Sequence, residues 1–129
     1  MEIKASLNNL RIAPKKVRLV GNLVKGMPVS EADSQLKFCL KAAARPLRKL
    51  VASAVANATH NKHLHKEDLY IKSIVVNEGF VLKRWKPRAM GRANQIKKRS
   101  SLVSLTLISK EKAKKLDKPA KVAAKGGKK

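Results

Sequence analysis

The sequence has a single cysteine, 3% aromatic residues and no long hydrophobic run. Because Cys39 has no second thiol to pair with, an intrachain disulfide is excluded, and we expect a reducing, cytosolic setting. No stretch is apolar enough to span a bilayer, and the first residues lack the hydrophobic core of a secretory signal. We therefore expect neither a membrane protein nor a secreted one.

Acidic residues are also scarce. Against 31 Lys and Arg there are only 8 Asp and Glu, which gives 129 residues a net charge of +23. So large a charge opposes compaction by self-repulsion unless a partner neutralises it, and nucleic acid is the usual source of that counter-charge. The hydrophobic content of 43% is nevertheless enough for one small core, so length and composition together predict a single domain.

Catalytic and cofactor-binding motifs are missing as well. The sequence has no glycine-rich phosphate loop and no nucleophile motif, and its few carboxylates are scattered. Three histidines, His60, His63 and His65, lie in an expected loop, but their spacing matches no standard zinc pattern and Cys39 is remote. We interpret them as part of a polar loop rather than a metal site, and we expect neither enzymatic activity nor a cofactor.

Positive charge is in excess between residues 83 and 99. This stretch of seventeen residues contains eight Lys or Arg and no acid. The turn-formers Pro87 and Gly91 lie near its centre, and β-branched and aliphatic runs flank it, a pattern typical of a β-hairpin. We predict an arm over residues 77–102 that extends roughly 40 Å, at about 3.3 Å per residue. Because an isolated ribbon is marginal in water, we expect it to be ordered only inside a polyanion.

A first helix is predicted after Pro14, whose missing N–H group suits the first helical position. Its apolar stripe is expected to comprise Val17, Val20, Leu23 and Val24. The basic residues of this segment lie largely off that stripe and form either a solvated face or a phosphate-binding face. The neighbouring basic arm leads us to favour phosphate contact.

Two more helices are predicted before the arm. Ser30 is expected to cap the second helix at its N-terminus, and Leu36 and Leu40 to form its apolar stripe. The third helix is expected from about residue 44 to residue 60. Its apolar residues recur at intervals of three and four, which identifies it as the core helix: Leu47, Leu50, Val51, Ala54, Val55 and Ala58.

Strands are predicted at the N-terminus and on both sides of the arm. Residues 69–76 are strand-like, and Gly79 with the two residues before it marks a bulge where the arm leaves the body. Residues 101–108 return as a strand whose Val103, Leu105 and Leu107 share one face. From residue 110 the composition becomes Lys-rich, so we expect residues 110–129 to form a flexible, disordered basic tail.

Three segments, taken together, resemble a known family. They are RIAPKKVRLV at residues 11–20, SAVANA at 53–58 with Asn61, and the Lys83-Arg84, Pro87-Arg88-Ala89 and Gly91-Arg92-Ala93 groups of the arm. In this order they resemble the bacterial-type large ribosomal subunit protein twenty-two family, over about residues 3–108. A collinear match of several segments is more specific than any one motif.

The resemblance implies an α+β fold, in which three helices pack on a small antiparallel sheet that carries a long β-hairpin arm. Residues 1–109, with the arm at 77–102, would form one rRNA-binding domain. It also implies a structural protein of the large ribosomal subunit that assists assembly and lines the polypeptide exit tunnel with its hairpin. The implied partners are large-subunit rRNA, neighbouring ribosomal proteins and the nascent polypeptide. The implied location is the cytoplasmic ribosome, or an organellar one.

The residues that we expect to contact rRNA are basic residues of the first helix and the arm: Arg11, Lys15, Lys16, Arg18, Lys83, Arg84, Lys86, Arg88, Arg92, Lys97, Lys98 and Arg99. The expected tunnel-facing tip comprises Pro87, Arg88, Ala89, Met90, Gly91, Arg92 and Ala93. Trp85 stands where the family commonly has a smaller residue. It either stacks on a base or an arginine, or packs within the hairpin.

Two other classes of protein carry comparable charge. A DNA-bending architectural protein uses basic β-arms with an apolar wedge, and Met90 or Pro87 is a candidate wedge. Such proteins work as dimers, and no obvious dimer face is visible in the sequence. A cationic membrane-active protein would need a strongly amphipathic basic helix, which is missing. Structural rRNA binding is therefore the favoured interpretation.

Overall fold

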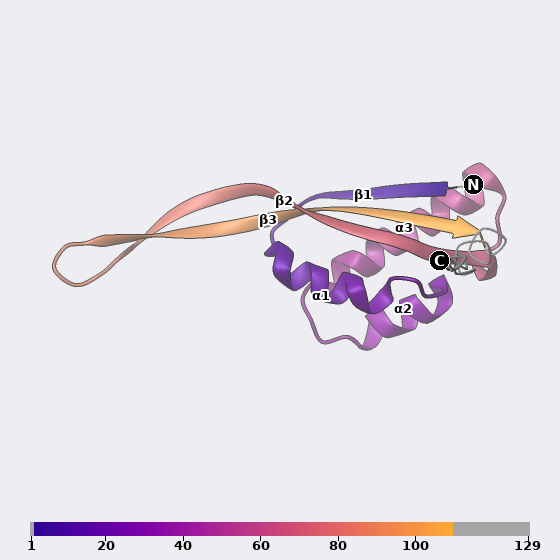
Figure 1. Ribbon diagram of the computed structural model, residues 1–129, viewed down its shortest axis with the longest axis horizontal. Helices are drawn as coiled ribbons and strands as arrows, with labels where there is room; N and C mark the ends of the chain where they lie inside the picture. Colours follow the sequence, from indigo (N-terminus) through magenta and orange to yellow (C-terminus); the bar gives the residue numbers. More distant parts are fainter. Residues whose placement is uncertain (1, 110–129) are drawn as a thin grey trace, which may run out of the picture.

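The computed structural model describes residues 2–109, and the tail expected at 110–129 lies outside them. Helices and strands follow in the order β1 (Glu2–Leu10), α1 (Pro14–Val24), α2 (Val29–Phe38), α3 (Ala44–Lys62), the 3-10 helix η1 (Lys66–Asp68), β2 (Leu69–Pro87) and β3 (Ala93–Ser109). The three helices gather at one end, and β2 and β3 continue alone into a long arm (Figure 1). The expected α+β fold, with three helices, a small antiparallel sheet and a hairpin arm, is confirmed. We call residues 77–102 the arm and the rest of the described chain the body.

The body sheet has the order β1-β3-β2, and both pairings are antiparallel. Side chains alternate along β3, so that Val103, Leu105 and Leu107 point to one face and are buried, as expected. Ser104 and Thr106 belong to the opposite face, which is more exposed. The buried residues of β3 form one cluster with the side chains of all three helices. The sheet is thus covered by helices on one face only, as is common for antiparallel sheets.

Helix α3 supplies the largest share of the helical core. Its buried residues recur at the predicted spacing, with Val55 only partly buried at the edge: Ala44, Leu47, Leu50, Val51, Ala54 and Ala58. Burial of a leucine side chain contributes roughly 1.5–3 kcal/mol. Pro46 lies in the first turn, where its missing N–H group breaks no helical hydrogen bond. The assignment of α3 as the core helix is confirmed.

Two leucines assigned to apolar stripes are not buried. Leu23 of α1 is 43% exposed, because the buried face of this helix runs through Val17, Val20, Gly21 and Val24 instead. Gly21 of this face packs against β2, where a Cβ built on it would make ordinary contact with Ile74 at 3.4 Å. Leu40 is fully exposed at 101%, because α2 has ended at Phe38. The stripe of α2 is completed at its start rather than its end, by Val29 and Ala32.

The predicted N-cap of α2 is also wrong. The helix begins at Val29 with Pro28 as its N-cap, and Ser30 lies inside the first turn without a capping hydrogen bond. The start is fixed by the sheet: the Gly26 N–H donates to the Ile71 carbonyl at 2.9 Å, and the Ile71 N–H donates to the Met27 carbonyl at 3.0 Å. These bonds attach the chain to β2 immediately before the helix, so the helix begins directly after them.

The histidine segment is only partly a loop. His60 belongs to the last turn of α3, and His63 ends this helix in a left-handed conformation with φ 51°. The His63 N–H donates to the Thr59 carbonyl at 3.2 Å, and the Leu64 N–H donates to the Ala58 carbonyl at 3.4 Å. The helix ends at Lys62, whereas its last buried apolar residue is Ala58. The expected end at residue 60 was therefore too early.

Candidate nucleic-acid interface

The arm is a continuous two-stranded ribbon with no core. Pairing of β2 with β3 runs from Val81 opposite Arg99 out to Pro87 opposite Ala93. All residues from 83 to 99 are exposed. The backbone ladder is complete along this length, but almost no apolar surface is removed from water. The arm therefore has hydrogen bonds without the burial that normally stabilises a sheet.

Basic side chains emerge from both faces of the arm. Residues directly opposite in an antiparallel pair point to the same side, and successive residues alternate. Lys83, Lys97 and Arg99 therefore share one face. The other face carries Arg84, Lys86 and Lys98. A ribbon that is basic on both sides is suited to lie between two anionic surfaces rather than on one.

Two residues of like charge also face each other across the strands of the arm. Lys83 stands directly across from Lys97, an arrangement that destabilises a free hairpin. Within residues 2–109, the one ion pair between a basic residue of the 83–99 stretch and a carboxylate joins Arg99 to Glu78 at 3.5 Å. Both of its side chains are largely exposed, so the pair contributes little. The charge of the arm is thus left for a partner to neutralise.

The predicted tip closes the hairpin as a five-residue loop over residues 88–92. The Arg88 N–H donates to the Arg92 carbonyl at 2.8 Å, directly beyond the last strand pair. Gly91 adopts φ 65°, which confirms its expected role in the turn, and Met90 adopts φ 59°. A left-handed conformation is uncommon for a residue with a long side chain. Met90 is 93% exposed, so its apolar side chain is presented outward.

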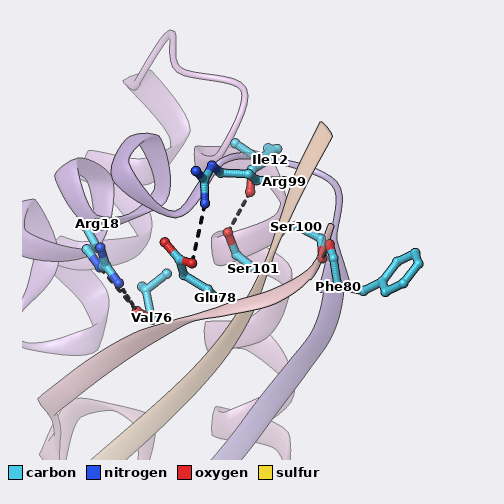
Figure 2. Close-up of polar contacts among 8 residues, drawn as sticks. All are labelled: Ile12, Arg18, Val76, Glu78, Phe80, Arg99, Ser100 and Ser101. Atoms are coloured by element: carbon cyan, nitrogen blue, oxygen red, sulfur yellow. Dashed lines mark hydrogen bonds and ion pairs between the residues drawn. The ribbon is translucent and has the colours of Figure 1, made fainter. Parts of the chain in front are cut away.

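A polar clasp attaches the arm to the body (Figure 2). The Arg18 guanidinium donates twice to the Val76 carbonyl, at 2.9 and 3.2 Å. The buried Ser101 hydroxyl donates to the Ile12 carbonyl at 2.6 Å. Arg18 was expected to bind phosphate, and the structure gives it this additional contact within the chain. The role of Ser101 was missed, because its partner lies 89 positions away in sequence.

The expected bulge lies at the same place. The register of β2 against β3 shifts between Glu78 and Val81. The Ser100 hydroxyl donates to the Phe80 carbonyl at 2.6 Å, which fixes the displaced residue. A Cβ added at Gly79 would lie 2.7 Å from the Ser100 Oγ, so any other residue here would displace that hydroxyl from its bond to Phe80. Bulge and clasp together set the direction in which the arm leaves the body.

Basic residues of the body converge on this junction. Arg11 and Lys16, at the start of α1, line one groove together with Lys97, Lys98 and Arg99 of the arm. Lys15 is exposed beside them, and no acidic residue lies in the first turn of α1. The structure thus brings the two predicted basic segments together at the arm's base. Arg88 and Arg92 remain apart from them, at the far end of the arm.

Among residues 2–109, no three His, Cys, Asp or Glu side chains are grouped so as to hold a metal ion. None of the helices described is long and apolar enough to cross a membrane. Trp85 lies across from Gln95 on the arm and is 66% exposed, so packing within the hairpin covers only part of its ring.

Comparison with known proteins identifies the family. The family model described as ribosomal protein L22p/L17e matches residues 5–108. The large ribosomal subunit protein uL22 of Syntrophobacter fumaroxidans is 48% identical over 110 residues, which cover 85% of this chain and 100% of the relative. The uL22 protein of Mycoplasma capricolum is 49% identical over 112 residues (87% and 100%). That of Desulfitobacterium hafniense strain Y51 is 46% identical over 110 residues (85% and 96%).

The match spans the segments that build the basic interface, namely residues 11–16 and both strands of the arm, together with the core helix α3. It favours a ribosomal protein over the DNA-bending and membrane-active alternatives. It also confirms that the chain is not an enzyme, because the family consists of structural ribosomal proteins. The chain belongs to the ribosomal protein L22p/L17e family, as a large-subunit ribosomal protein of the bacterial uL22 type.

Proposed function

We propose that the chain binds large-subunit rRNA along its arm and the adjoining end of its body, and that residues 1–109 act as one rRNA-binding domain. The observation that carries this proposal is the distribution of charge on the arm: both faces are basic, and Lys83 opposes Lys97. Such a ribbon is stabilised most when phosphates lie on both sides of it, because they neutralise the charge on both faces. In folded RNA these contacts recognise backbone and shape rather than a groove code.

Docking rests on the body and on the two flanks of the arm. The residues proposed to contact rRNA here are Arg11, Lys15, Lys16, Arg18, Lys83, Arg84, Lys86, Lys97, Lys98 and Arg99. Arg18 acts in part through the clasp, which holds α1 against β2 at Val76. Contacts on both faces of one arm also connect separate rRNA segments, and in this way the protein assists subunit assembly. Neighbouring ribosomal proteins are further partners of the body.

The tip is proposed to line the polypeptide exit tunnel, where the nascent chain passes. The arm extends roughly 40 Å beyond the body, at about 3.3 Å per residue, farther than any body residue reaches. Its tip combines Arg88 and Arg92 with apolar Pro87, Ala89, Met90 and Ala93. Phosphate binding alone does not require an exposed methionine. A surface of small and apolar groups is suited to a lumen through which varied peptides move.

The test shortens the tip without disturbing the strands. Because Pro87 and Ala93 form the last pair, residues 88–92 can be replaced by Asn-Gly, which favours a two-residue hairpin turn. We expect the variant to enter large subunits at the normal level, measured by mass spectrometry of purified subunits. Chemical footprints of the rRNA along the tunnel wall are expected to change, together with the stalling of nascent chains.

A control separates charge from shape. In the double variant Arg88→Gln and Arg92→Gln, the loop keeps its length and loses its two charges. We expect a smaller change of the tunnel footprint than in the shortened loop. Loss of the Asn-Gly variant from subunits would show that the tip is an anchor. Normal incorporation with an unchanged tunnel footprint would show that the tip lies elsewhere.

A further inference from the structure

A groove of about 880 Å³ lies where the arm meets the body. Its walls come from four places in the chain: the segment entering α1, the loop before α3, the base of β2 and the base of β3. Its size falls within the range of ordinary ligand pockets, roughly 300–1,000 Å³. The docking contacts proposed above include its basic residues, but neither they nor the tunnel-facing tip accounts for its apolar part.

The groove has an apolar part. Phe80, Leu82 and Ile12 line it, and Phe80 is 70% exposed. Figure 2 shows the Phe80 ring standing clear of the strands. The Ser100 hydroxyl donates to the Phe80 carbonyl at 2.6 Å and so holds the backbone at this position. A large aromatic ring in an exposed position offers a flat surface for stacking.

The groove also has a basic rim. Arg11, Lys16, Lys97 and Lys98 line it alongside the apolar residues. Arg99 lines it too, although its guanidinium also lies 3.5 Å from Glu78. The concentration of positive charge disfavours a basic or neutral peptide as the occupant and favours an anion. An apolar floor beside such a rim is the combination that a nucleotide requires, since it joins a planar base to a phosphate.

We propose that this groove takes a single unpaired nucleotide of rRNA, with its base against Phe80 and its phosphates among the basic side chains of the rim. The inference rests on the proposed rRNA binding and assigns one site within it. A fully paired duplex presents only phosphates and sugars here and leaves the apolar floor uncovered. Sequence-tolerant stacking of an unstacked base is the recognised mode for exposed aromatic residues in RNA-binding proteins.

The chain permits a direct test, because Phe38 and Phe80 are its only phenylalanines. Incorporation of 4-fluorophenylalanine gives two ¹⁹F NMR signals, one from the groove and one from Phe38, which is 79% exposed at the end of α2. The probes are a hairpin RNA with one unpaired adenosine and the same hairpin with an abasic ribose at that position. We expect the adenosine probe to shift the Phe80 signal beyond any shift with the abasic probe, and to leave the Phe38 signal unchanged.

Affinities for the two probes supply the second readout. Stacking of one base on an aromatic side chain is typically equivalent to a preference of roughly 5- to 150-fold for the adenosine probe. Phe80→Ala is expected to remove this preference, and Phe38→Ala, the same change at a similarly exposed ring, to retain it. Thermal unfolding of both variants checks that the body is intact, which we expect because neither ring is buried.

The outcomes separate this site from the general function. Equal affinities and equal ¹⁹F shifts with both probes would overturn the nucleotide site and leave the groove to a side chain of a neighbouring protein. A preference that persists in Phe80→Ala would also overturn it, because the base would then be bound elsewhere. In either case, salt-sensitive binding of both probes would leave the proposed rRNA binding intact. Failure to bind either RNA would count against both proposals.

Discussion

The body and the arm share two strands and one hydrogen-bonded ladder, yet they are held in place by different means. In the body half of β3, Val103, Leu105 and Leu107 are at most 1% exposed. In the arm half of the same strand, Lys97, Lys98 and Arg99 are exposed. Backbone pairing alone therefore does not distinguish a stable sheet from a marginal one. The difference lies in whether the side chains are covered. The body is covered by its own helices, whereas the arm is exposed along its length and, in the proposed function, depends on a partner of opposite charge.

The clasp lies at the boundary between the body and the arm. Ser101, Gly79 and Arg18 position the arm through hydrogen bonds and close contact rather than through apolar burial. These contacts lie within the chain itself, so the direction of the arm is set without a partner. In the proposed function, RNA orders the ribbon and does not determine its direction.

The largest expected effect concerns the arm and salt. If on the order of six to ten basic residues neutralise phosphates, RNA affinity is expected to fall about 10³- to 10⁵-fold between about 50 and 200 mM salt. The double variant Lys83→Gln and Lys97→Gln is expected to make the slope of log affinity against log salt shallower by roughly one per residue removed. Fluorescence titration against large-subunit rRNA at several salt concentrations measures both.

Lys72→Gln is the matched control for the salt experiment. Lys72 pairs with Glu2 on the body sheet, away from the basic groove. Its loss is expected to leave the salt slope nearly unchanged. A flat salt response of the wild-type protein would mean that charge is not the main source of affinity.

The second effect concerns the body. Leu50 of α3 is 5% exposed, and Leu50→Ala is expected to destabilise the free protein by roughly 2–5 kcal/mol. Arg88→Ala and Arg92→Ala are expected to leave the free energy of unfolding nearly unchanged, since both side chains are exposed at the tip. Urea unfolding followed by circular dichroism compares the three variants. If the arginine variants unfold the body and Leu50→Ala does not, the assignment of core and arm is reversed.

The parts that could be predicted from sequence are those with a repeating or local signal. The spacing of Leu47, Leu50, Val51, Ala54 and Ala58 identified α3, because each turn of a helix returns to the same face. The run of basic residues and its central turn identified the arm. Pro14 and Gly91 were placed correctly, because their backbone preferences act locally.

The parts that could not be predicted depend on contacts between distant residues. The Ser101 hydroxyl donates to the carbonyl of Ile12, 89 positions away, and no local sequence pattern predicts such a pair. Ser30 looked like an N-cap, but backbone bonds from Gly26 and Met27 to Ile71 fixed an earlier start of α2. The groove beside Phe80 is formed by four separate segments, so it becomes visible only when they are brought together.

The third effect tests the clasp. Ser101→Ala removes the hydroxyl that binds the Ile12 carbonyl and leaves a buried acceptor without its partner, at a cost of about 1–3 kcal/mol. Ser104→Ala is the matched control on the exposed face of the same strand, where the change is expected to stay within about 0.5 kcal/mol. Equal effects in urea unfolding would show that the clasp does not stabilise the junction.

The smallest effect concerns an exposed ion pair of the body. Arg48 donates to Asp33 at 2.7 Å and thereby lowers the pKa of that carboxyl below its ordinary value of 3.8. Because the folded-state pKa is depressed, the stabilisation is present above the ordinary pKa and is lost as the pH falls through the lowered one. Asp33→Asn is expected to cost under about 1 kcal/mol at neutral pH, since both partners are exposed to solvent. Unfolding at a series of acidic pH values is expected to show the wild-type and variant stabilities converging; a difference that grows on acidification would contradict the pairing.

The most direct test of the central claim is amide hydrogen exchange along β3, compared between the free protein and the protein in purified large subunits. Amides at residues 103–107 are expected to be protected in both states, because apolar burial in the body holds them. Amides at residues 94–99 are expected to exchange rapidly in the free protein and to become protected only in the subunit, where the proposed RNA contacts enclose the arm. Equal protection of both halves of β3 in the free protein would contradict the claim that the arm depends on a partner for its order.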